Sequence, residues 1–201
     1  MTRIDQAEEQ QLLDQKVLPI PLGNWKTSIE QLFLVLKKQP FSNPWIFTGQ
    51  RALAGALIRG CTSERLIDSR MGARPYKIMP SSEHSGHRAL HAVGFANVSH
   101  EVVFCILGQA ALANGSFFSA CNLLQLQPSK VVFVILEQEI SKDAPISKQS
   151  QYNVATLASL FDLGYVSVQQ NVIEDVLEDV LRNVWTDVME NKSQILHIIL
   201  S

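Results

Sequence analysis

The second half of the chain alternates between short apolar runs and amphipathic stretches. Two apolar runs, VVFCIL at 102–107 and VVFVIL at 131–136, are continuous, as is typical of strands that are buried on both faces. Two shorter apolar runs predict further strands at 165–168 and 195–200. Three stretches with helical spacing predict helices at 115–126, 153–164 and 172–190. The alternation predicts an α/β fold, with a mostly parallel sheet and helices on both of its faces.

The helix predicted at 172–190 carries the most regular pattern in the chain. Its valines recur at every fourth position: Val172, Val176, Val180, Val184 and Val188. Such spacing places side chains along one face of a helix. We therefore expect this valine stripe to pack into the protein core.

The N-terminal part predicts helices that precede the alternating region. Residues 26–38 place Ile29, Leu32 and Phe33 on one face of an amphipathic helix, and two prolines follow it. The residues before this helix are polar and predict one further short helix. We therefore expect residues 1–44 to form a helical N-terminal arm.

Two segments after the arm are rich in glycine and alanine. The sequences at 49–59 and 86–98 predict helices whose small side chains permit close packing. Between them, residues 69–86 contain glycine, prolines and serines and predict a long loop. Together with the alternating region, these segments predict an α/β domain over residues 45–201.

The composition is that of an ordinary globular chain. Of its 201 residues 46% are hydrophobic and 18% are charged, and the net charge of −2 favours neither nucleic acid binding nor a polybasic membrane surface. The apolar runs fall short of the roughly 18 residues that a spanning helix needs. The three cysteines, Cys61, Cys105 and Cys121, are too few and too spread for a zinc cluster. We expect a cytoplasmic protein that binds neither membrane nor nucleic acid.

Polar residues follow both continuous apolar strands directly. Gly108 and Gln109 come after the first strand, and Glu137 and Gln138 come after the second. In a parallel sheet the carboxyl ends of the strands meet at one edge, where ligands of such folds bind. The sequence therefore predicts a site at this edge.

Three motifs in order resemble the alpha subunits of thiamine diphosphate-dependent 2-oxo acid dehydrogenases. The segment from 108 to 138 begins GQAALANGSFF and ends VVFVILEQ, which is similar to the cofactor motif of that family. The helix start GQRALAGALIRG at 49–60 and the helix GHRALHAVGFA at 86–96 resemble two further family motifs. The resemblance implies a thiamine diphosphate-binding fold over most of the chain.

The same resemblance implies cofactor-binding positions, and these have changed here. The family motif opens Gly-Asp-Gly and closes Asn-Asn; its acid and its final amide hold the magnesium that carries the diphosphate. Gly108 is kept, but Gln109 and Gln138 occupy the two ligand positions, and Arg70 is what remains of a Tyr-Arg pair that binds diphosphate. Glutamine supplies no charge, and Mg²⁺ requires hard oxygen ligands in near-octahedral geometry.

These changes lead to two hypotheses within the family. The first is a degenerate alpha-subunit-like protein, a pseudoenzyme without cofactor or catalysis that acts as a structural, regulatory or assembly subunit. The second is an active, shortened alpha-type subunit that binds thiamine diphosphate with magnesium and performs oxidative decarboxylation together with a beta partner. Trp45, at the place of a family histidine, favours the first.

A third hypothesis places another ligand in the former cofactor cleft. His84, His87 and His91 lie close together in sequence, and the last two share one helix face at i and i+4. Imidazoles at this spacing can bind zinc or nickel. The segment 51–91 is also locally basic, which suits an anionic ligand. Polar histidines at a helix start are the alternative explanation.

The family pairs two domains of this fold, so a lone domain exposes the surface that meets its partner. We therefore expect a homodimer, or a heteromer with a beta-type subunit. The small-residue segments 50–59 and 87–97 are the expected interface helices, since they allow backbones to approach closely.

Overall fold

The structure, a computed structural model, describes most of the chain. The described residues are 3–18, 21–23, 25–38, 40–41, 43–68, 74–79, 84–137, 140–141, 144–170, 172 and 174–199.

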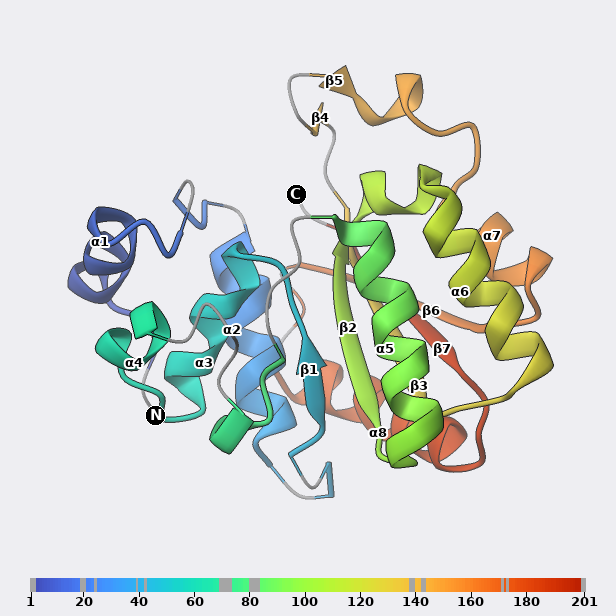
Figure 1. Cartoon of the computed structure of the whole chain (residues 1–201), viewed down its shortest axis with the longest axis horizontal. Coiled ribbons are helices and arrows are strands. Elements are labelled where there is room, and N and C mark those ends of the chain that lie inside the picture. Colours follow the sequence, from blue (N-terminus) through green and yellow to red (C-terminus); the bar gives the residue numbers. More distant parts are fainter. Residues whose placement is uncertain are drawn as a thin grey trace.

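A parallel five-stranded sheet forms the centre of the molecule (Figure 1). Its order is β1-β2-β3-β7-β6, and every neighbouring pair is parallel. The strands are β1 (Trp45–Phe47), β2 (Val103–Gly108), β3 (Val131–Leu136), β6 (Gly164–Gln169) and β7 (Gln194–Ile199). A separate antiparallel pair, β4 (Ile140–Ser141) and β5 (Ala144–Pro145), follows β3. The predicted α/β fold with a parallel sheet is confirmed.

Helices cover both faces of this sheet. The longer ones are α1 (Gln6–Asp14), α2 (Trp25–Leu36), α5 (Ser85–Ser99), α6 (Gly115–Leu126), α7 (Val154–Leu160) and α8 (Glu174–Met189). The shorter ones are η1 (Arg51–Ala54), α3 (Gly55–Ile58), α4 (Ser63–Asp68), η2 (Arg74–Tyr76), η3 (Gln109–Ala113) and η4 (Ile146–Lys148). Side-chain packing assigns α2, α3 and α8 to one face, the α2–α8 face, and α5, α6 and α7 to the other, the α5–α7 face.

The strand order explains why α8 lies apart from α6 and α7. The chain moves in one direction across the sheet from β2 to β3 and on to β6, and then returns to place β7 between β3 and β6. Crossovers between parallel strands are right-handed, so reversing the direction moves the connecting helix to the opposite face. Thus α6 and α7 cover one face, and α8, which joins β6 to β7, covers the other.

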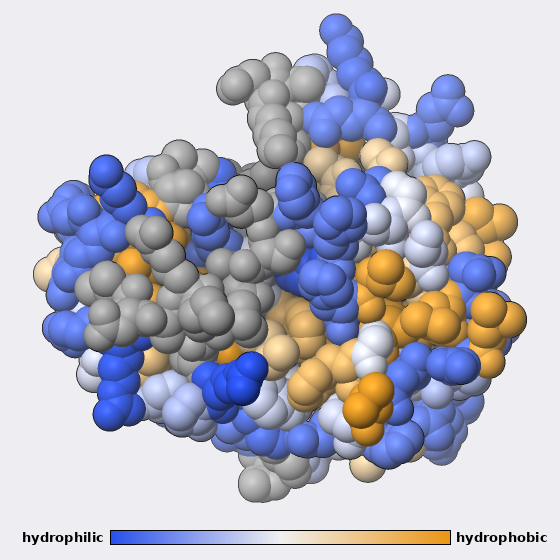
Figure 2. All heavy atoms as spheres, in the orientation of Figure 1, coloured by the Kyte–Doolittle hydropathy of each residue, from blue (hydrophilic) through white to orange (hydrophobic). Residues whose placement is uncertain are grey.

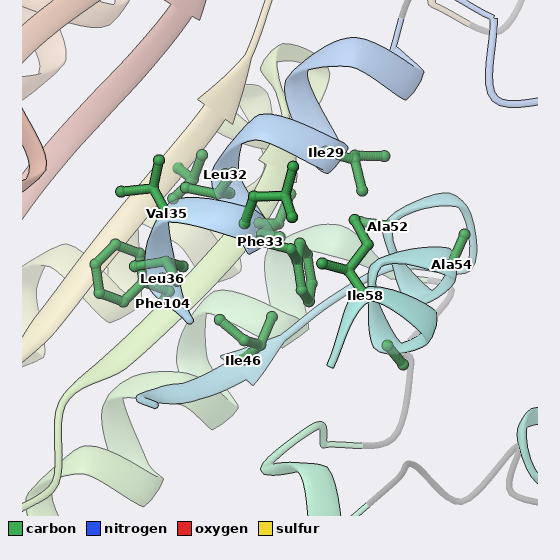
Figure 3. Packing of buried hydrophobic residues seen from close by; sticks show 14 of the residues in the cluster. Ile29, Leu32, Phe33, Val35, Leu36, Ile46, Ala52, Ala54, Ile58 and Phe104 are labelled. Carbon is green, nitrogen blue, oxygen red and sulfur yellow. The ribbon is translucent and has the colours of Figure 1, made fainter. Parts of the chain in front are cut away.

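Side chains alternate along the strands between two apolar clusters. In β2, Phe104 and Ile106 join the cluster under the α2–α8 face, whereas Cys105 and Leu107 join the cluster under the α5–α7 face. Figure 3 shows Ile46, Phe104 and side chains of α2, η1 and α3 meeting in the first cluster. Phe33 of α2 is fully buried there, so α2 belongs to the same core as the sheet.

Local signals in the sequence fix several helix ends. Asn114 caps α6, because its Oδ1 accepts from the backbone N–H of Ser116 at 2.9 Å, and Asn153 caps α7 through the N–H of Thr156 at 2.7 Å. His100 ends α5 in the left-handed conformation with φ of 58°. Within the described residues, no helix has both the length and the apolar character needed to cross a membrane.

Most predicted elements are confirmed, and two predictions are wrong in part. The helix predicted at 153–164 ends at Leu160, and Gly164 begins β6. The segments 115–126 and 131–136 form α6 and β3, and the helices predicted at 26–38, 86–98 and 172–190 are present with ends that differ by a few residues. The valine stripe follows the core only in part: Val184 and Val188 are buried, but Val176 is 41% exposed. Val172, which precedes α8, and Val180 pack partly buried against the core. The fully buried face of α8 consists of Leu177, Leu181, Val184 and Val188.

Candidate functional site at the carboxyl edge of the sheet

The predicted site lies at the carboxyl edge of the sheet. Gly108 ends β2 and is paired with Leu136, the last residue of β3. Gln109 therefore follows one strand and Glu137 the next at the same edge, as expected from the sequence. Gln109 is half-buried and begins η3.

Arg88 of α5 binds the backbone of β2 at the carboxyl edge of the sheet, beside the end of β1. The β1–β2 pairing ends at Phe47 and Cys105, and the next β2 carbonyl directed toward β1 is that of Ile106. The Arg88 Nη1 donates to this carbonyl at 2.7 Å. A Cβ at position 49 would lie 2.7 Å from Arg88 Nη2, so only glycine fits at position 49 with the guanidinium in this place. Arg88 is 6% exposed, and burial lowers the pKa of its guanidinium.

Trp25, the first residue of α2, covers the backbone of Gly108. A Cβ at position 108 would lie 3.6 Å from the indole ring, in ordinary contact. The guanidinium of Arg51 lies over the same ring, 5.1 Å from its centroid. Burial lowers the pKa of Arg51. The N-terminal arm thus reaches the predicted site and contributes an aromatic ring to it.

Glu137 is bound from the neighbouring strand. Its Oε2 lies 2.8 Å from Nε2 of His197, which is in the middle of β7. The other imidazole nitrogen, Nδ1, lies 3.0 Å from the hydroxyl of Tyr165 on β6. Burial lowers the pKa of His197, and the Glu137 carboxylate opposes this shift.

The other predicted site residues are dispersed or lie outside the described part. Gln138 and Arg70 fall outside the described residues. His84, His87 and His91 are exposed on or just before α5, with 5.4 Å between the ring centroids of the first two. Among the described residues, no group of three histidine, cysteine or acidic side chains could hold a metal ion.

Three cavities are lined by described residues. Two, of about 450 and 460 Å³, are at the opposite edge and share Pro128 and Asn191 in their linings. The third, a groove of about 410 Å³, runs beside α5. Its lining is Phe47, Met79, Arg88, Leu90, His91, Gly94 and Phe95.

Comparison with solved structures identifies the fold. The chain is similar to transketolase from Campylobacter jejuni, with a TM-score of 0.65, 14% identity, and coverage of 98% of this chain and 38% of that chain. It is also similar to a Mycobacterium smegmatis protein assigned as a thiamin diphosphate-dependent enzyme, with a TM-score of 0.60, 16% identity, and coverage of 87% and 32%. The chain has the fold of thiamine diphosphate-dependent enzymes.

The likeness extends to the fold and not to a particular family. No protein-family model matches the sequence, and no curated protein matches it either. The chain spans about a third of the length of the two solved structures. The thiamine diphosphate-binding fold is thus established, while the resemblance to dehydrogenase alpha subunits rests on the sequence motifs.

The described residues at the carboxyl edge fit a magnesium–diphosphate group poorly. Mg²⁺ requires about six oxygen ligands, with carboxylates the usual protein contribution. Gln109 offers one neutral amide oxygen, and the carboxylate of Glu137 already contacts His197. The Trp25 ring lies against Gly108, where the family motif begins.

Sequence reasoning missed the side chains that close this edge. Trp25 and Arg88 approach it from helices that lie far from the 108–138 motif in sequence. For Arg88, the available signal was a charged residue inside the otherwise small and apolar helix sequence GHRALHAVGFA. For His197, the signal was a single titratable residue inside the apolar run ILHIIL.

Proposed function

We propose that this chain is a non-catalytic protein of the thiamine diphosphate-binding fold, related to dehydrogenase alpha subunits. In this proposal it works without cofactor, as a structural or assembly subunit. The observation that carries the proposal is that the protein's own side chains occupy the carboxyl edge of the sheet.

Three contacts support the absence of cofactor chemistry. Arg88 occupies the space beside Gly49 and donates to the Ile106 carbonyl. Trp25 covers Gly108, and His197 binds the carboxylate of Glu137. A diphosphate would have to displace some of these groups, and a magnesium ion would find one neutral oxygen from Gln109 where the family has an acid. These features favour a scaffold over an active alpha-type subunit.

An apolar surface on α5 and α6 supports the role in assembly. The two most exposed large hydrophobic residues of the described chain are Val98, at 84%, and Leu126, at 72%, near the C-terminal ends of these helices. Figure 2 shows hydrophobic side chains gathered over the region of α5 and α6. The groove beside α5 continues this area with Leu90 and Phe95. We call this area the α5–α6 surface.

Gly94 lies in the α5 part of this surface and leaves the helix backbone bare. A Cβ built at position 94 meets no atom within 4 Å. Glycine in a helix interior costs about 1 kcal/mol relative to alanine, so its presence calls for a reason other than packing within the chain. Close approach by another helix is such a reason, and we propose that α5 of a second copy makes it. The chain then forms a homodimer through the α5–α6 surface.

Light scattering of the purified chain tests this assembly role. The wild-type chain should have the mass of a dimer at micromolar concentrations. The Gly94→Leu variant should be a monomer with an unchanged circular dichroism spectrum, because the added side chain meets nothing in its own chain.

Gly115 provides a matched control. It also lies in a helix with no atom within 4 Å of a built Cβ, but it is the first residue of α6 at the carboxyl edge. Gly115→Leu should remain dimeric. A monomeric wild-type chain, or a dimeric Gly94→Leu variant, would contradict the proposed surface.

A further inference from the structure

Glu137, His197 and Tyr165 are linked by two close polar contacts that the proposed function does not use. The three side chains come from consecutive strands in the sheet order β3-β7-β6, with Glu137 directly after β3. The register pairs His197 with Ile135 and Tyr165 with Ile195. Since alternate residues of a strand share a face, all three side chains lie on the α5–α7 face.

The carboxylate of Glu137 favours one protonated nitrogen of His197. The Oε2 of Glu137 lies 2.8 Å from Nε2 of His197; the contact is not aligned as a hydrogen bond, but the negative charge of the carboxylate favours a proton on Nε2 over one on Nδ1. A neutral imidazole then has an unprotonated Nδ1, which accepts from the Tyr165 hydroxyl at 3.0 Å. Burial lowers the pKa of His197, which favours this neutral form.

This arrangement matches the signature of an activated nucleophile. A hydroxyl within hydrogen-bond reach of a base, with the base held by a third group, is the pattern that nucleophilic catalysis shares across unrelated folds. His197 is nearly buried, with 8% of its side chain exposed, whereas Tyr165 is 39% exposed. The base is thus held in place while the hydroxyl-bearing residue reaches solvent.

The charges near these three side chains indicate which kind of group the Tyr165 hydroxyl could attack. The contacts given for the three residues join an acidic side chain, an imidazole and a phenol, and include no lysine or arginine. A phosphoryl donor would bring further negative charge without a cation to meet it. An acyl carbonyl is uncharged and suits the site better.

We propose that Tyr165, His197 and Glu137 form a triad that makes the Tyr165 hydroxyl a nucleophile toward acyl groups carried as activated esters or thioesters. The Tyr165 oxygen attacks the acyl carbon, and its proton passes to Nδ1 of His197. The bond from the acyl carbon to the leaving group breaks, and the leaving group departs with the electron pair. The Glu137 carboxylate stabilises the imidazolium that forms. The product is an O-acyl tyrosine.

Acetylation by p-nitrophenyl acetate tests the proposal on the full chain. Release of p-nitrophenolate is followed by absorbance, and the modified positions are located by peptide mass spectrometry. Tyr152 is an internal reference, since it is 49% exposed and its described hydrogen bonds involve only its backbone. Tyr165 should be acetylated at least tenfold faster than Tyr152, a modest share of the roughly 10²–10⁴-fold that a positioned base supplies.

Variants distinguish acetylation that depends on the triad from the general reactivity of exposed tyrosines. Tyr165→Phe should abolish the fast phase of p-nitrophenolate release, and Tyr152→Phe should leave it unchanged. His197→Gln should slow acetylation of Tyr165 to the rate of Tyr152. Equal rates at the two tyrosines of the wild-type chain would overturn the proposal, and this comparison holds even if His197→Gln fails to fold. A fast phase that persists in a folded His197→Gln variant would also overturn it.

Discussion

Replacing Arg88 by methionine tests whether its guanidinium closes the sheet edge. Methionine keeps much of the length and volume of the side chain but cannot donate to the Ile106 carbonyl, now bonded at 2.7 Å. A hydrogen bond from a charged group contributes about 1.5–3 kcal/mol, and a buried acceptor left without a partner costs about 1–3 kcal/mol, two terms that overlap in one measurement. Removal of a buried charge from a site 6% exposed offsets part of this loss. We expect Arg88→Met to lower the free energy of unfolding by about 2 kcal/mol.

Urea denaturation followed by circular dichroism measures this loss. Arg74 is a suitable control, because it is exposed and a methionine there should change the free energy of unfolding by less than about 0.5 kcal/mol. Arg88→Lys should be intermediate, since an ammonium keeps the charge but not the planar fork. If Arg88→Met is as stable as the control, the hydrogen bond from Arg88 to the Ile106 carbonyl does not stabilise the sheet edge.

Three further predictions concern the core and its titratable groups. Phe33→Ala removes a fully buried ring and should lower the free energy of unfolding by about 3–5 kcal/mol in urea titrations; a loss below about 1 kcal/mol would contradict the packing shown in Figure 3. The pKa of His197 is lowered from 6.5 in the folded chain, so the unfolded chain binds this proton more readily, and stability should fall as the pH drops through about 6.5. In the His197→Gln variant, the free energy of unfolding should therefore depend less on pH between about pH 7 and pH 5. An unchanged pH dependence would assign the effect to other groups. Burial raises the pKa of the Cys105 and Cys121 thiols to about 12, so both should resist Ellman's reagent in the native state and react only after unfolding.

The sequence predicts the centre of the fold well because the signal there is local. The runs that form β2 and β3 are apolar throughout, which only strands covered on both faces require, and Asn114 marks the start of α6 through a cap. β1 escaped prediction because it has three residues, too few for a period to appear.

The error in α8 has a geometric cause. Residues four apart drift by about 40° around a helix of 3.6 residues per turn, so the four valines that lie within α8 turn through roughly 120°. The stripe therefore leaves the core face at Val176, which is 41% exposed. The core instead follows Leu177, Leu181, Val184 and Val188, whose spacing alternates between four and three.

The groups at the carboxyl edge could not be found from spacing along the chain. Trp25 meets Gly108 across 83 positions, a contact created by packing of the N-terminal helix. Glu137 meets His197 because β7 inserts between β3 and β6, a strand order that the sequence does not reveal. The resemblance located the edge, but only the fold shows which side chains occupy it.

Calorimetric titration of the purified chain with thiamine diphosphate in the presence of Mg²⁺ tests whether the carboxyl edge of the sheet can hold the cofactor. We predict no saturable heat, because Arg88, Trp25 and the Glu137–His197 pair occupy the edge and Gln109 brings no charge for the metal. Saturable binding with a micromolar dissociation constant and one site per chain would contradict it.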